Sequence, residues 1–120
     1  MPKLSGFSSL AALPVEQIGD KVSRRVASGD QAMVVWWQFK KGAHVTAHSH
    51  PHEQIISMIS GSLDVRIGTE KRIMKPGDIA VIPGGVEHEV LVLEDTDVID
   101  TFAPPREEFI GGGLPSYMKA

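Results

Sequence analysis

Short runs of β-forming residues, separated by turn residues, follow one another between positions 21 and 102. In Leu63-Asp64-Val65-Arg66-Ile67 every second residue is apolar, which is the period of a strand with one buried face. Turn formers such as Pro76-Gly77-Asp78 close the runs. The pattern predicts eight strands, at residues 21–27, 32–39, 54–59, 62–67, 71–74, 79–82, 87–93 and 97–102.

Many short strands with no helical pattern between them favour a sandwich or barrel over a parallel α/β sheet. In residues 90–93 both faces are apolar, so we expect that strand to be covered on both sides. Trp36 and Trp37 place one indole on each face of their strand. We expect one indole to fill the core and the other to lie at a subunit contact.

The flanking residues are less regular than the strand region. We expect an N-terminal arm at residues 1–20, one barrel domain at 21–103 and a C-terminal tail at 104–120. Residues 106–109 can form one helical turn near the start of that tail.

Length and composition indicate one domain with one core, since 120 residues are 42% hydrophobic and 22% charged. A net charge of −3, without a basic cluster, argues against a nucleic-acid partner. With no bilayer-length apolar run and no signal-peptide pattern, we expect a cytoplasmic protein without a membrane partner. Because the chain has no cysteine, any metal must be bound through nitrogen and oxygen.

Histidines gather in one short segment. Four of the five histidines fall within residues 44–52, and the fifth is His88. His48 and His50 are two residues apart, so on a strand their imidazoles share a face. Such a pair, with a third imidazole from another strand, can enclose one divalent cation. The alternative is a solvated, histidine-rich loop.

Pro51 interrupts this segment, because proline cannot donate to a strand ladder. A bulge at residues 51–53 would turn His52 away and return Gln54 to the inner face. We therefore expect His52 at the cavity mouth or behind the ligands, and His44 at the surface or rim.

Two glycine-framed segments, 42–61 and 77–88, resemble the two signature motifs of the cupin superfamily. The resemblance implies an all-β cupin double-stranded β-helix, or jelly-roll barrel. It also implies a metal held by two histidines, a carboxylate or amide, and a third histidine. Counting back from Gly61 places Gln54 at the position where many cupins have Glu, and Glu53 on the opposite face. The implied metal ligands are His48, His50, Gln54 and His88.

This ligand set adds no negative charge to a divalent ion. The ion would keep its full charge and act as a stronger Lewis acid at its open positions. We expect one divalent transition metal, Zn, Ni, Fe, Mn or Cu, among which the sequence does not choose. The alternative is a metal that only stabilises the barrel. The strands carry enough apolar residues to form a core without it, which argues against this alternative.

Residues 48–54 also resemble one cupin group, the KdgF-type proteins of pectin and alginate degradation. Residues 21–25 and 97–109 resemble that group's N-terminal strand and its closing strand with the following turn. This resemblance implies linearisation and ketonisation of 4,5-unsaturated uronates. It places Asp100, Phe102 and Arg106 in or near the substrate cavity.

The residue types of these three positions are compatible with catalysis. Asp100 can transfer a proton to an enol carbon, and Arg106 can pair with a uronate carboxylate. Asp100 and Phe102 share strand parity, so both can face the interior. The alternatives are a loop-capping role for Asp100, a core role for Phe102 and a solvated surface charge for Arg106.

The leading hypothesis is a metal-dependent enzyme that converts a small anionic, sugar-like substrate. One alternative is a metal-dependent dioxygenase acting on a small organic substrate, and another is a non-catalytic module that binds a sugar acid. No nucleotide fingerprint indicates a cofactor besides the metal. Exposed β edges and the paired indoles favour a homodimer.

Overall fold

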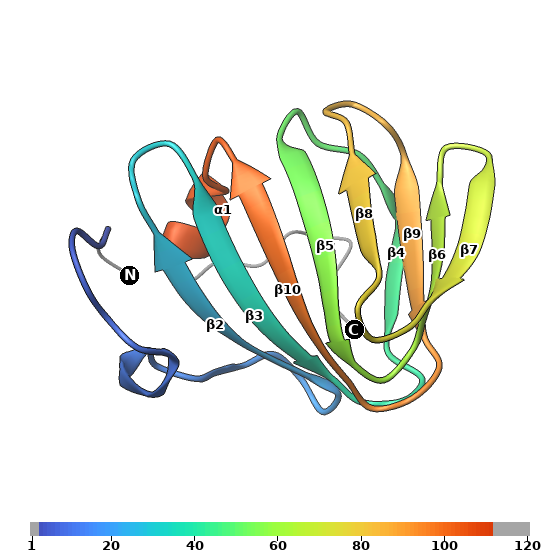
Figure 1. Ribbon diagram of the computed structural model, residues 1–120, viewed down its shortest axis with the longest axis horizontal. Coiled ribbons are helices and arrows are strands. Elements are labelled where there is room, and N and C mark those ends of the chain that lie inside the picture. Colours follow the sequence, from blue (N-terminus) through green and yellow to red (C-terminus); the bar gives the residue numbers. More distant parts are fainter. Residues whose placement is uncertain (1–2, 112–120) are drawn as a thin grey trace.

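The computed structural model describes residues 3–111, which form two antiparallel sheets (Figure 1). The expected all-β architecture is confirmed. The six-stranded sheet has the order β1 (Glu16–Gln17), β2 (Val22–Ser28), β3 (Met33–Phe39), β10 (Thr96–Ala103), β5 (Glu53–Ser60), β8 (Ile79–Ile82). The four-stranded sheet has the order β4 (His44–His48), β9 (His88–Val92), β6 (Leu63–Ile67), β7 (Glu70–Met74).

The eight predicted strands all occur, with ends that differ by at most one residue. The predicted helical turn is α1 (Glu107–Ile110), and a 3₁₀ turn, η1 (Leu10–Ala12), lies in the N-terminal region. Within the part of the chain that the structure describes, no helix is long and apolar enough to cross a membrane. The division into arm, barrel and tail stays a prediction, and residues 112–120 of that tail lie outside the described residues.

Two strands, β1 and β4, were not predicted. The pairing of β4 with β9 shifts register between Val45 and His48, so β4 lacks simple alternation. As a result Val45 and His48, three residues apart, both line the interior. A period of two cannot reveal a strand whose inward face changes at a bulge.

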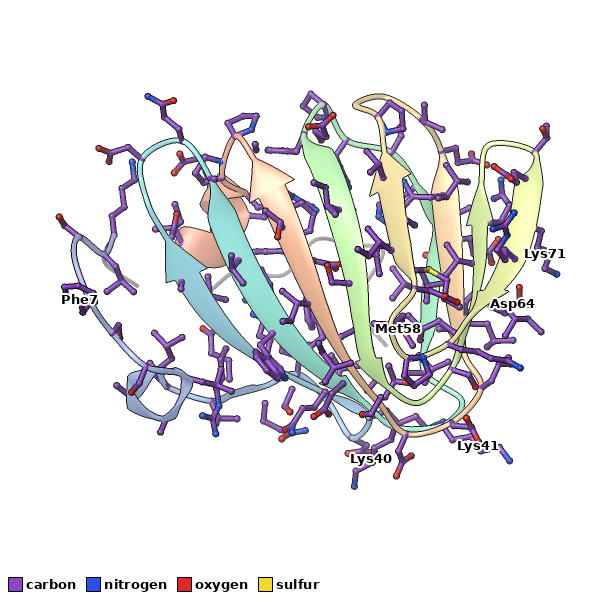
Figure 2. The ribbon with its side chains drawn as sticks, viewed as in Figure 1. Phe7, Lys40, Lys41, Met58, Asp64 and Lys71 are labelled. Carbon is purple, nitrogen blue, oxygen red and sulfur yellow. The ribbon has the colours of Figure 1, made fainter. Side chains whose placement is uncertain are left out.

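One hydrophobic core fills the space between the sheets, and both sheets contribute to it. In β3 the alternation is regular, so Met33, Val35, Trp37 and Phe39 are all buried. Each such side chain stabilises the fold by about 1.5–3 kcal/mol through apolar burial. Figure 2 shows Met58 inside the molecule, whereas Lys40, Lys41 and Lys71 lie at its outside. Trp37 is the core indole, and a subunit contact for Trp36 stays a prediction.

The expectation that residues 90–93 are covered on both faces is wrong for the single chain. Val90 and Val92 are buried, but Leu91 remains 41% exposed. Its register neighbours on the outer face are His44 and Asp64, both polar. Because the outer face around Leu91 is polar, a second apolar layer does not pack on it.

The turn between β5 and β6 requires glycine at position 61. Gly61 has φ +88°, a conformation that side chains disfavour. A Cβ there would overlap the Asp95 carbonyl oxygen and lie 2.7 Å from Thr96 Cα. Both neighbours are backbone atoms, so they cannot move aside cheaply. This contact joins the β5–β6 turn to the start of β10.

We predict that Gly61→Ala lowers the free energy of unfolding by about 2 kcal/mol or more, from strain plus overlap. Gly29→Ala is the matched control, since a Cβ there would meet its nearest atom, the Ala32 carbonyl oxygen, at 3.7 Å. Urea unfolding of both variants measures the difference. Equal stability of the two variants would contradict the requirement for glycine at position 61.

Candidate metal centre

Three histidines from separate segments converge at one end of the barrel. His48 ends β4, His88 begins β9, and the two are paired in register. His50 comes from the loop between β4 and β5. One ligand atom of each imidazole lies within 4.8 Å of the others. That spacing allows all three to hold a single ion.

Gln54, the fourth expected ligand, lies beside them. It is buried near the start of β5, and its Oε1 is 3.1 Å from Nε2 of His50. Glu53 is exposed, as the strand parity predicts. The structure therefore brings together all four side chains that the sequence identified.

The backbone fixes the direction in which each imidazole points. In all three rings Nδ1 lies within hydrogen-bond distance of a carbonyl oxygen two residues away. Donation from Nδ1–H leaves the Nε2 lone pair for a ligand bond, as in many metal sites. The Nδ1–O distances are 2.7 Å for His48 to Thr46, 3.1 Å for His50 to His52 and 2.9 Å for His88 to Val86.

The other nitrogen of His88 is the clearest sign of a missing partner. His88 is 1% exposed, and its Nε2 has no hydrogen-bond partner among residues 3–111. A buried polar atom without a partner is costly and calls for an explanation. A metal ion bound by this nitrogen and by the neighbouring imidazoles would explain it. The three histidines therefore fit the expected divalent metal.

Burial also sets the charge of these rings. It lowers the pKa of His48 and His50 to about 4, and it lowers the pKa of His88 as well. The positive charge of Arg106 adds to the effect at His50. All three imidazoles are thus neutral near pH 7 and can donate lone pairs without first losing a proton.

Two glycines hold the loop that carries His50. The N–H of Gly85 donates to the His50 carbonyl at 2.8 Å. A Cβ on Gly84 would overlap the Pro51 carbonyl oxygen, so the two loops approach too closely for any side chain there. The β8–β9 loop therefore contacts the backbone of one candidate ligand and of the residue that follows it.

The remaining two histidines lie outside this group, as expected. His44 is exposed, and its Nε2 is 2.5 Å from Glu89 Oε2 on the outer face. His52 is half-buried behind His50, with ring centroids 5.4 Å apart, and its carbonyl accepts the His50 hydrogen bond. Its role is to orient a candidate ligand through its backbone.

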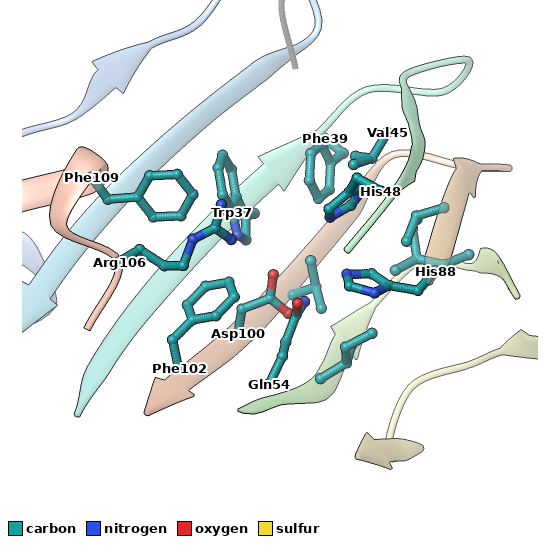
Figure 3. A pocket seen from close by; sticks show the side chains of 14 residues that line it. Trp37, Phe39, Val45, His48, Gln54, His88, Asp100, Phe102, Arg106 and Phe109 are labelled. Atoms are coloured by element: carbon teal, nitrogen blue, oxygen red, sulfur yellow. The ribbon is translucent and has the colours of Figure 1, made fainter. Parts of the chain in front are cut away.

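A cavity of about 40 Å³ adjoins His48 and His88 (Figure 3). Asp100, Phe102 and Arg106, the three expected catalytic residues, all line it. Trp37 and Phe109 line it too, and neither is among the predicted cavity residues. Phe102 also belongs to the core, with its ring 5.8 Å from that of His50.

Asp100 faces this cavity in an apolar setting. Burial raises the pKa of its carboxyl to about 7, while nearby Gln54 and Trp37 side chains and the Arg106 charge act in the opposite direction. A carboxyl group with a pKa near neutrality can both give and take a proton. The geometry thus suits proton transfer better than loop capping.

Arg106 is 3% exposed, so its alternative assignment as a solvated surface charge is wrong. Its guanidinium carbon lies 5.1 Å from the centre of the Phe102 ring and 4.6 Å from that of Phe109. Its Nε donates to Glu108 Oε1 at 2.7 Å. The cation therefore packs against two aromatic rings beside the cavity.

Comparison with known proteins shows the family of the chain. A family model described as a cupin domain matches residues 35–100. The chain belongs to the cupin family. This cupin is 41% identical over 100 residues to the pectin degradation protein KdgF of Dickeya dadantii (strain 3937), covering 81% of this chain and 91% of that protein.

Two solved structures are similar over nearly their whole length. An RmlC-like cupin from Shewanella frigidimarina NCIMB 400 has a TM-score of 0.85 and 29% identity, covering 91% of this cupin and 99% of that chain. KdgF from Halomonas sp. has a TM-score of 0.82 and 30% identity, covering 88% and 99%. The expected cupin barrel and the resemblance to KdgF-type proteins are confirmed.

We predict that the double variant His48→Ala/His50→Ala loses the bound metal, because two of three imidazole ligands are gone. His44→Ala, which removes an exposed imidazole from the same strand, should keep it. Elemental analysis of the purified proteins measures metal per chain. Equal metal content in wild type and double variant would refute the ligand assignment.

We also predict that acid destabilises the metal-free cupin. The lowered pKa values of His48 and His50 favour folding while the rings are neutral, so this stability is complete above pH 6.5 and is lost as pH falls through about 4. Urea midpoints of chelator-treated protein should fall across that window. Asp100, with a raised pKa, titrates in the opposite sense.

The variant His48→Gln/His50→Gln separates the effect of the histidines on the pH dependence of stability from that of Asp100. It keeps Asp100 and removes two of the imidazoles. Its urea midpoint should change less between pH 6.5 and 4 than that of the wild type. An identical pH dependence in the two proteins would show that the buried rings do not control it.

Proposed function

We propose that this cupin is a metal-dependent enzyme that converts a small anionic, sugar-like substrate. The favoured substrate class is a 4,5-unsaturated uronate from pectin or alginate, which the enzyme would convert to its linear keto form. The observation that carries the proposal is the cavity that Asp100 and Arg106 share with two of the three clustered histidines, His48 and His88. The similarity to a pectin degradation protein supports the substrate class.

The reaction is an isomerisation, so every atom of the substrate is kept. The C1–O5 bond of the ring hemiacetal breaks while the C1 hydroxyl loses its proton, which yields an aldehyde. The electron pair of the broken bond stays on O5 as an enolate at C4=C5, which becomes a ketone when C4 accepts a proton in place of the one lost from the C1 hydroxyl. A metal at the histidines would supply Lewis acidity toward a ring or hydroxyl oxygen.

Asp100 is the proposed proton-transfer group. It lines the cavity on β10, and its carboxyl group has a pKa near the pH at which it would work. The ring of Phe102, two residues on along the same strand, gives the cavity an apolar wall on which a sugar ring can pack.

Arg106 is the proposed anchor for the uronate carboxylate. A guanidinium can bind a carboxylate with two parallel hydrogen bonds, and burial strengthens this charge pairing. Because Arg106 lines one part of the cavity and His48 and His88 line the opposite part, a carboxylate at Arg106 can leave the sugar ring near Asp100 (Figure 3).

We further propose that the protein works as a homodimer. β8 forms an edge of the six-stranded sheet, and its Ile79 and Val81 side chains are largely exposed. An edge strand with exposed apolar side chains tends to be covered in the assembled state. Sedimentation of the purified protein tests this assembly.

We predict that the metal-loaded protein speeds the loss of ultraviolet absorbance from a 4,5-unsaturated monouronate, because ketonisation removes the conjugated C4=C5 bond. The rate is compared with that in buffer and with the chelated protein. Activity retained with redox-inert zinc would exclude an oxygen-dependent dioxygenase. Tight uronate binding without any absorbance change would contradict the enzyme and support a binding module.

We predict that Asp100→Asn lowers kcat about 100-fold or more, because an amide cannot exchange the proton. Metal content and fold should be preserved, since the two side chains are nearly the same size. Asp97→Asn, at the other face of the same strand, is the control and should keep full activity. Undiminished turnover by Asp100→Asn would remove Asp100 from the proton-transfer step.

A further inference from the structure

Two buried arginines pack against one phenyl ring in the interior. The guanidinium carbons of Arg24 and Arg106 each lie 4.6 Å from the centre of the Phe109 ring. Arg24 also lies 5.6 Å from the Trp37 ring, and Arg106 lies 5.1 Å from the Phe102 ring. The order of contacts is therefore Trp37, Arg24, Phe109, Arg106 and Phe102. Phe102 lies beside the candidate metal centre.

Each arginine is held by a carboxylate in the same way. Nε of Arg24 donates to Glu16 Oε1 at 2.9 Å, and Nε of Arg106 donates to Glu108 Oε1 at 2.7 Å. The two ion pairs differ in one respect, because Arg106 lines the cavity whereas Arg24 is not among its lining residues. The chain thus contains two similar arginine–glutamate pairs, of which one faces the proposed substrate.

The bond from Nε constrains the plane of the guanidinium group. A planar fork held at Nε by a carboxylate and packed against two aromatic rings has little rotational freedom left. The Nη groups form a different edge of the fork from the Nε–H that Glu108 accepts. Figure 3 shows the Arg106 side chain reaching past Phe102 and Phe109 toward Asp100.

We propose that Glu108 is a positioning residue for recognition of an anionic substrate. By holding Nε of Arg106, Glu108 orders the guanidinium before the substrate arrives and directs its Nη edge into the cavity. The inference rests on the proposed role of Arg106 as the carboxylate anchor. It adds a residue on α1 that does not line the cavity and is not one of the candidate metal ligands.

The consequence is a preorganised anion site. Without Glu108 a long side chain must be ordered at the moment of binding, which weakens affinity about tenfold. Glu108→Gln keeps an oxygen that can accept from Nε, so it should preserve most of the ordering. If Glu108 acts by positioning Arg106, Glu108→Gln should bind the anion nearly as well as wild type. If its negative charge is what matters, Glu108→Gln should bind as weakly as Glu108→Ala.

The test measures D-glucuronate binding to the metal-loaded protein by calorimetry. This saturated uronate carries the carboxylate but lacks the C4=C5 bond, so it is not consumed. We expect Glu108→Ala to bind about tenfold more weakly than wild type and Glu108→Gln to bind within about threefold of it. With the unsaturated substrate, Glu108→Ala should raise KM while kcat changes little.

Glu16→Ala is the matched control, because it removes the equivalent carboxylate from Arg24. It should lower stability much as Glu108→Ala does, yet bind glucuronate with wild-type affinity. If Glu108→Ala binds as well as Glu16→Ala, or if Glu108→Gln binds as poorly as Glu108→Ala, the inference is overturned.

A second readout needs no substrate. The Nε–H proton of Arg106, observed by NMR, should exchange slowly in wild type and Glu108→Gln and rapidly in Glu108→Ala. Rapid exchange already in wild type would also overturn the inference. Failure of the wild type to bind or convert any uronate, with slow Nε–H exchange intact, would instead refute the proposed function.

Discussion

The site depends on three hydrogen bonds between imidazole Nδ1 groups and backbone carbonyls two residues away. Each bond fixes the orientation of one ring and leaves its Nε2 as the ligand atom. The carbonyls belong to strand ends and to a loop held by Gly84 and Gly85, so the barrel itself aims the rings. Burial then keeps the rings neutral, which makes them available to a cation at physiological pH.

The charges around the cavity follow from this neutral ligand set. Gln54 lies between His50 and Asp100, and an amide offers an oxygen to one neighbour and N–H groups to the other. A glutamate at position 54 would instead place two carboxylates side by side and raise the proton affinity of the pair. In the function that we propose, Arg106, ordered by Glu108, would provide the positive charge for an acidic substrate. Lewis acid, proton transfer and anion binding would then be divided among separate groups.

The sequence predicted most strands because turn residues separate them and one face of each is apolar. It missed β4, whose bulge changes the inward face between Val45 and His48. The candidate metal ligands were predictable because their spacing is fixed within two short segments. The burial of Arg106 was not, since an arginine followed by two glutamates is typical of a solvated surface. Its setting depends on Phe102 and Phe109, which α1 and β10 bring together only in the folded chain.

The most direct test of the account is anomalous diffraction from crystals of the metal-loaded protein, recorded at the absorption edge of the metal that it retains. The account predicts one strong peak per chain, within bonding distance of Nε2 of His48, His50 and His88 and of Oε1 of Gln54. A peak elsewhere, or none in protein that carries stoichiometric metal, would contradict it.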